Sequence, residues 1–154
     1  MHALLPMIFG IGRGKMDIRI VRREYRPGEA IDGTLWLDLK ESVMARGVSV
    51  ALVGERKVVR HQGKGTQVST ERVFEFALPL DGEKSYAPGG SEYRFTITVP
   101  QSIQGLLPQG ESLSGLMKVV RFLSSPNPVR WYLDAKLDVP KSVDVSKRVQ
   151  INIV

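Results

Sequence analysis

The 154-residue sequence contains no cysteine and only two histidines, His2 and His61. The absence of cysteine excludes disulfides, thiolate metal sites, cysteine nucleophiles and iron–sulfur clusters. Two histidines are too few for a histidine-rich metal site. A chain without cysteine suits a reducing compartment, and we expect a cytoplasmic protein.

Long apolar runs are also missing. The most apolar stretch, residues 3–12 (ALLPMIFGIG), is far shorter than the roughly 20 residues that a transmembrane helix needs. No Lys or Arg precedes this stretch and no small-residue cleavage site follows it, so it is not typical of a secretory signal. We expect no transmembrane segment. We expect one domain over residues 1–154, with residues 1–12 as an apolar N-terminal segment.

The motifs that would indicate catalysis are incomplete. Residues 10–15 (GIGRGK) approach a phosphate-binding loop, but Phe9 occupies its first glycine position and Met16 replaces the required Ser or Thr. Residues 110–115 (GESLSG) are not a nucleophile elbow, because Ser114 stands where that motif needs glycine. The spacings of calcium and zinc sites are absent as well. The sequence therefore predicts no enzymatic activity and no catalytic, cofactor-binding or metal-binding residue.

The charge of the chain is positive and unevenly distributed. Lys and Arg number 22 against 16 Asp and Glu, which gives a formal net charge of +6 and a pI near 9.8. Basic residues dominate two stretches, and they are Arg13, Lys15, Arg19, Arg22, Arg23 and Arg26 in the first and Arg56, Lys57, Arg60, His61, Lys64 and Arg72 in the second. Such a surface attracts anionic partners without specificity. Nucleic acid and anionic lipid are therefore alternative partners.

Apolar and polar residues alternate with a period of two in seven stretches, which is typical of strands with one buried face. These stretches are residues 16–20, 31–39, 48–52, 74–80, 93–99, 131–139 and 149–153. Turn signals separate them, among them Pro27-Gly28 and the sequence Gly63-Lys64-Gly65, which predicts the tip of a hairpin. The pattern predicts an all-β fold, an antiparallel β-sandwich of about seven or eight strands.

One stretch has helical spacing instead. Residues 112–123 (SLSGLMKVVRFL) place Leu113, Leu116, Met117, Val120 and Leu123 three or four positions apart. A serine can cap the start, and Pro126 lies just beyond the end. We expect one short helix there, packed on the sandwich by its apolar face.

Four sequence patterns in this order resemble the N-terminal domain of arrestin-like proteins. They are residues 24–37 (EYRPGEAIDGTLWL), 45–54 (ARGVSVALVG), 86–100 (YAPGGSEYRFTITVP) and 129–138 (VRWYLDAKLD). Residues 9–15 (FGIGRGK) are similar to the sporulation-control branch of the same clan. The resemblance spans nearly the whole chain. It implies an immunoglobulin-like β-sandwich that acts as an adaptor without catalytic activity.

The resemblance also implies how the chain would bind. Such domains engage cargo tails, receptors or scaffold subunits through strand edges and loops, and the chain has length for one sandwich only. Arg13 and Lys15 lie near the basic residues that precede the first strand in that family, so they are candidates for binding an acidic or phosphorylated peptide. Trp36 lies on the polar face of its strand, where it contacts a partner or is covered by a loop or the helix. The full set of expected partner-binding residues is Arg13, Lys15, Trp36, Lys57, Arg60 and Lys64.

The first functional hypothesis is therefore a non-enzymatic adaptor that binds a protein partner, by adding an extended segment to a sheet edge or through its loops. A homodimer formed through the same edge is a natural variant. The alternatives are a basic surface for anionic lipid or nucleic acid, and a sugar-binding or carbohydrate-active β-sandwich. Asp134 and Asp138 share one strand face with Lys136 between them, which indicates a solvated, charge-balanced face and not a catalytic carboxylate pair.

Overall fold

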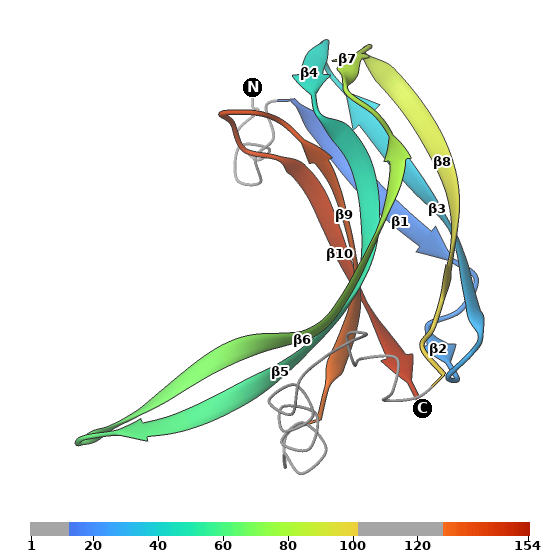
Figure 1. Cartoon of the computed structure of the whole chain (residues 1–154). Helices are drawn as coiled ribbons and strands as arrows, with labels where there is room; N and C mark the ends of the chain where they lie inside the picture. Colours follow the sequence, from blue (N-terminus) through green and yellow to red (C-terminus); the bar gives the residue numbers. More distant parts are fainter. Residues whose placement is uncertain (1–12, 102–127) are drawn as a thin grey trace, which may run out of the picture.

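The computed structural model describes residues 13–101 and 128–154, and these residues form ten β-strands and no helix (Figure 1). The strands are β1 (Gly14–Ile20), β2 (Glu24–Tyr25), β3 (Ala30–Leu39), β4 (Val43–Ala45), β5 (Gly47–Gln62), β6 (Gly65–Asp81), β7 (Lys84–Tyr86), β8 (Gly89–Thr98), β9 (Arg130–Asp138) and β10 (Val145–Ile153).

The strands form two facing layers and a short two-stranded sheet. One layer has the order β1-β3-β8, and the other has the order β2-β10-β9-β5-β6. All pairs are antiparallel except the short pairing of β2 with the end of β10. The small sheet joins β4 to β7. The described residues therefore form an all-β structure in which two sheets face each other, the arrangement of a β-sandwich.

The core lies between the two layers and follows the alternation of the sequence. On β3, Leu35 and Leu37 are fully buried while Trp36 between them points outward. Leu52 of β5 and Leu133 of β9 are buried in the facing sheet. Among the described residues the buried side chains are those of apolar residues and of Tyr25 and Tyr86, and the Tyr86 hydroxyl donates a hydrogen bond to the Gly82 carbonyl.

The seven predicted strand stretches lie in strands except for Val99 and Val139, which follow the ends of β8 and β9, but the predicted number of seven or eight strands was wrong. The structure adds β2, β4 and β7, which have two or three residues each and are too short to show an alternation. The helix expected at residues 112–123 lies outside the described residues and is not confirmed. The hairpin tip predicted at Gly63-Lys64-Gly65 is confirmed, since β5 ends at Gln62 and β6 begins at Gly65.

The Pro27-Gly28 turn before β3 is also confirmed. Gly28 has a φ of 87°, and the Glu29 amide donates a hydrogen bond to the Arg26 carbonyl at 3.1 Å, as in a type II turn. We expect Gly28→Ala to lower the free energy of unfolding by about 1–2 kcal/mol, because an L side chain disfavours this φ. A Cβ there would also lie 3.2 Å from Cγ of Gln101.

Chemical denaturation of this variant beside Gly90→Ala measures the effect. Gly90 lies in β8, its φ is not in the left-handed region, and a Cβ there would meet nothing within 4 Å. An equal loss of unfolding free energy in both variants would show that the positive φ of Gly28 is not the cause of its effect on stability.

Candidate interaction arm

The β5–β6 hairpin continues well past the sandwich, and we call its projecting part, residues 55–72, the arm (Figure 1). β9 accompanies β5 only as far as the pair Glu55–Arg130, and beyond it β6 is the one strand of the described residues that pairs with β5. Eight residues in each strand give a length of about 26 Å. In β6 every residue from Gly65 to Arg72 is exposed, whereas on β5 the side chains of Glu55 and Arg56 at the base of the arm are largely covered.

A β-bulge separates the arm from the sandwich. Gly54 pairs with Phe74, whereas Glu55 pairs with Arg72, so Val73 is an extra residue in β6. A bulge bends a strand and increases its twist, which explains why the hairpin leaves the sheet at this point. The arm is thus a distinct element attached at one bend.

The arm carries cations and an exposed apolar pair. From residue 57 to residue 70 the sequence has Lys57, Arg60 and Lys64, all exposed, and no acidic residue. Val59 and Val68 face each other across the two strands and are 47% and 59% exposed. Apolar cross-strand pairs stabilise a sheet when they pack against a neighbouring strand, so this exposed pair is an apolar surface on which a further strand can pack.

The turn at the tip fixes which backbone groups face outward. Gly63 has a φ of 57° and Lys64 has no positive φ, as in a type II′ hairpin turn with glycine first. The pair that flanks a two-residue turn, here Gln62 and Gly65, is hydrogen-bonded, and hydrogen-bonded and open pairs then alternate along the hairpin. The amides and carbonyls of Thr66, Val68 and Thr70 therefore point away from β5, along the free edge of β6.

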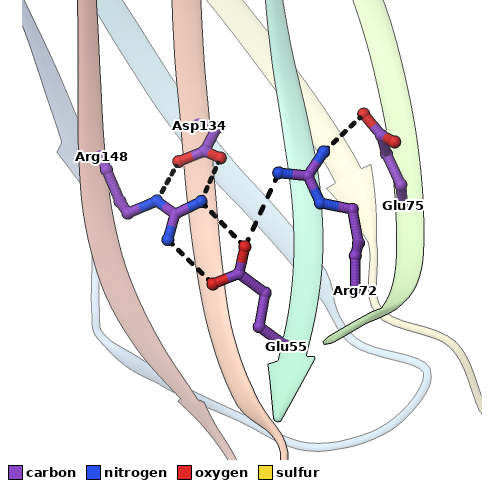
Figure 2. A network of polar contacts seen from close by, with 5 residues as sticks. All are labelled: Glu55, Arg72, Glu75, Asp134 and Arg148. Atoms are coloured by element: carbon purple, nitrogen blue, oxygen red, sulfur yellow. Dashed lines mark hydrogen bonds and ion pairs between the residues drawn. The ribbon is translucent and has the colours of Figure 1, made fainter. Parts of the chain in front are cut away.

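Figure 2 shows a charged network on the outer face of the five-stranded sheet, at the base of the arm. The Arg148 guanidinium of β10 donates to Asp134 of β9 at 2.6 and 2.7 Å and to Glu55 of β5 at 3.0 and 3.2 Å. Arg72 of β6 lies 3.6 Å from the same Glu55 carboxylate and 3.2 Å from Glu75. The network ties the first residue of the arm to two strands of the sandwich.

The hydrogen bonds of this network shift the pKa values of its members. The hydrogen bonds from Arg148 lower the pKa of Glu55 below its ordinary value of 4.5. Hydrogen bonds to Asp134 and Glu55 raise the pKa of Arg148. The Arg148 guanidinium also lies 4.3 Å from the centre of the Tyr132 ring, a cation–π distance. Both charges therefore persist across the neutral range and hold the arm at its base.

The lowered pKa of Glu55 predicts a pH-dependent contribution to stability. Because its folded pKa lies below 4.5, its contribution is complete above pH 4.5 and is lost as the pH falls through the folded value. At pH 7 we expect Glu55→Gln to lower the free energy of unfolding by about 1 kcal/mol, a charged hydrogen bond reduced by partial solvent exposure. Denaturation curves at several pH values should show this difference shrinking below pH 4.5. Glu41→Gln, at an exposed position outside the network, is the control, and a pH-independent difference for Glu55→Gln contradicts the account.

A shallow hollow of about 460 Å³ lies over the same outer face. Its carboxylates include Asp134, which is held by Arg148, and Glu75, which is held by Arg72. The negative charge of Asp134 is therefore balanced by an arginine of the neighbouring strand, as expected for a solvated face that carries both charges. Asp144, the third carboxylate of the hollow, accepts a hydrogen bond from the Val139 amide at 2.8 Å, so each of the three already has a partner within the chain and the hollow gives no support to a carbohydrate-active site.

Five of the six predicted partner-binding residues fall into two groups. Lys57, Arg60 and Lys64 all belong to the arm, with Lys57 and Arg60 on opposite faces of β5 and Lys64 in the turn at the tip. Lys15 and Trp36 are exposed on the outer face of the three-stranded sheet, where the Arg19 guanidinium lies 5.6 Å from the Trp36 ring. The remaining residue, Arg13, precedes β1, and its carbonyl accepts a hydrogen bond from the Lys40 amide at 2.9 Å. Binding at either group stays a prediction.

Sequence reasoning did not find the free edge of β6 or the network. The one available signal for the edge was the run Thr66-Gln67-Val68-Ser69-Thr70, which favours a strand without an apolar alternation. Among the described residues no helix is long and apolar enough to cross a membrane. No three His, Asp or Glu side chains in residues 13–101 and 128–154 come together as a metal site.

Comparison with known proteins identifies the fold. No family model matches the sequence. No curated protein matches it either. Among solved structures, Spo0M, a sporulation control protein from Bacillus subtilis, is similar with a TM-score of 0.62 and 20% sequence identity over 93% of this chain. The chain spans 50% of the length of Spo0M. The fold of this chain is thus similar to that of a sporulation control protein, which agrees with the resemblance seen in the sequence.

Proposed function

We propose that this chain is a non-catalytic adaptor that binds another polypeptide by adding its strand to the free edge of β6. The observation that carries the proposal is the position of β6, a 17-residue strand at the end of its sheet. Along the described chain no strand lies on its outer side. An edge of this length presents a row of amides and carbonyls to which an extended segment can bind.

The part of this edge that lies in the arm lacks the features that usually prevent strand addition. Proteins protect edges with lysine, proline, bulges or inward charges. In β6, Pro79 and the bulges at Val73 and Leu80 all lie outside the arm, and the first charged residue of the strand is Glu71. Residues 65–70 are uncharged and free of proline, so this segment is the receptive part of the edge.

The arrestin-like fold supports a binding role, since Spo0M is named for control and not for a reaction. A regulatory role exerted through binding belongs to the same proposal. Its setting would be the cytoplasm, in agreement with the absence of cysteine.

Site-specific cross-linking in the source cells tests the proposal. A photoreactive residue at Gln67 of the arm should give a discrete protein adduct, and one at Lys136 should not. Lys136 is exposed but belongs to β9, which has a strand on either side. Equal labelling at both positions, or none at Gln67, overturns the proposal.

A pair of variants at one position separates strand addition from other contacts. Thr70→Pro removes an amide that points outward and leaves the β5–β6 hydrogen bonds in place, as proline at a solvent-facing edge position does. Thr70→Ala removes the same side chain but keeps the amide. We expect the Gln67 adduct to be lost in Thr70→Pro and retained in Thr70→Ala. Loss in both variants would point to the side chain and contradict strand addition.

The cations of the arm favour a second candidate, binding of nucleic acid. Lys57, Arg60 and Lys64 lie within one two-stranded ribbon, an element that fits a major groove. Retention of the purified chain on duplex DNA should then fall steeply between about 50 and 200 mM salt. It should also fall when the three residues are replaced by glutamine. Retention that persists without these cations excludes this candidate.

A further inference from the structure

We infer that the strand bound by the arm is that of a second copy of this chain, paired antiparallel about a two-fold axis at Val68. The inference rests on the proposed strand addition to β6 and names its occupant. The part of β6 outside the arm, residues 73–81, and the outer face of the three-stranded sheet around Trp36 remain open to other partners.

Symmetry limits the registers that two arms can adopt. A two-fold axis perpendicular to the ribbon keeps the same face of each arm on the same side, so residues of one face must pair with each other. Thr66, Val68 and Thr70 share one face, and their amides and carbonyls point outward. Pairing Val68 with its own equivalent places Thr66 opposite Thr70 of the second copy. Every outward group of this segment then meets a partner, in about six hydrogen bonds.

The exposed valines favour this register. Val59 and Val68 are opposite each other in one arm. With Val68 on the axis, the two arms form a row of four valines across a four-stranded sheet, in the order Val59, Val68, Val68, Val59. An isolated two-stranded hairpin is marginally stable, and a four-stranded sheet with an apolar row is the arrangement that stabilises it.

The charges are compatible with a second copy. The inner two strands carry no charge from residue 65 to residue 70, and Glu71 falls opposite Gly65. The cations Lys57 and Arg60 lie on β5, which becomes the outer strand of each arm. The like charges that approach each other are Lys64 and Arg72, and Arg72 is already neutralised by Glu55 and Glu75. The area of such a contact is small beside the roughly 1,600 Å² of a standard interface, so we expect a dimer that depends on concentration in the micromolar range.

The absence of cysteine makes a direct test possible in the full chain. In the proposed pair the two Val68 Cα atoms lie about 5.5 Å apart, within the roughly 4.4–6.8 Å that a disulfide spans. Under mild oxidation Val68→Cys should form a disulfide-linked dimer roughly tenfold faster than Thr66→Cys, whose equivalents lie about 13 Å apart. A mixture of Thr66→Cys and Thr70→Cys should form the mixed disulfide instead.

A charged variant tests the same pairing without oxidation. Val68→Lys places two lysines opposite each other only in the two-fold dimer, so the dimer seen by sedimentation should dissociate. Val68→Thr, which keeps a β-branched side chain, is the control and should retain most of the dimer. Disulfide formation that is equal at positions 66 and 68 overturns the register, and a monomer at all concentrations overturns the self-pairing.

The outcomes also separate this inference from the proposed function. A Gln67 adduct that contains a different protein, together with a monomeric chain, leaves strand addition standing and overturns the second copy as its occupant. No adduct and no dimer overturn both. An adduct of the chain with itself, lost in Thr70→Pro, supports both.

Discussion

Replacing residues 57–70 by an Asn-Gly turn should leave the sandwich folded and abolish association through the arm. Arg56 and Glu71 form a cross-strand pair, and by the alternation from the tip this pair is hydrogen-bonded, as a two-residue turn requires. No residue of the arm belongs to the hydrophobic core of the described chain. We therefore expect the free energy of unfolding to change by less than about 1 kcal/mol, as for surface changes.

The same replacement should reduce self-association by more than about tenfold, since it removes the whole receptive edge. Sedimentation and chemical denaturation of the full chain and the shortened chain measure the two effects separately. A shortened chain that still dimerises would place the interface elsewhere, and a shortened chain that unfolds would show that the arm supports the core.

Arg148→Ala should have the largest effect in the charged network. The Arg148 guanidinium binds two carboxylates, and its removal leaves Asp134 and Glu55 without their common counter-ion. We expect a loss of about 1–2 kcal/mol, discounted because the side chain is 41% exposed. Proteolysis should also cut the arm more readily, since its base is no longer tied to β9 and β10.

Two further substitutions test whether the loss of stability in Arg148→Ala comes from its hydrogen bonds to two carboxylates. Arg148→Lys keeps the charge but cannot bind two carboxylates by a planar fork, so its loss should be intermediate. Lys147→Ala removes an exposed neighbour on the same strand and should be nearly neutral. Equal stability of Arg148→Ala and Lys147→Ala would show that the network does not hold the arm.

The alternation of apolar residues predicted the sandwich because one face of each strand is buried. Ile31, Leu35 and Leu37 are core residues for that reason, and the turn at Pro27-Gly28 followed from the φ preferences of its two residues. The glycines around Lys64 likewise marked the tip of the hairpin.

The arm could not be predicted in the same way. Every arm residue of β6 is exposed, so no apolar period marks where the hairpin leaves the sheet. The network was also out of reach, because Glu55 and Arg148 are 93 residues apart and meet only through the registers of β5, β9 and β10. Residues of opposite charge are common in the sequence, and the strand order alone selects which of them pair.

Amide exchange along β6 tests the central claim most directly, and it can be measured in the free and in the associated chain. The amides of Thr66, Val68 and Thr70 point outward, whereas those of Gln67 and Ser69 point toward β5. If a strand adds to this edge, the outward amides become protected on association and the inward amides, already bonded, do not change. Unchanged exchange at Thr66, Val68 and Thr70 in the associated chain would contradict the assignment of β6 as the interaction edge.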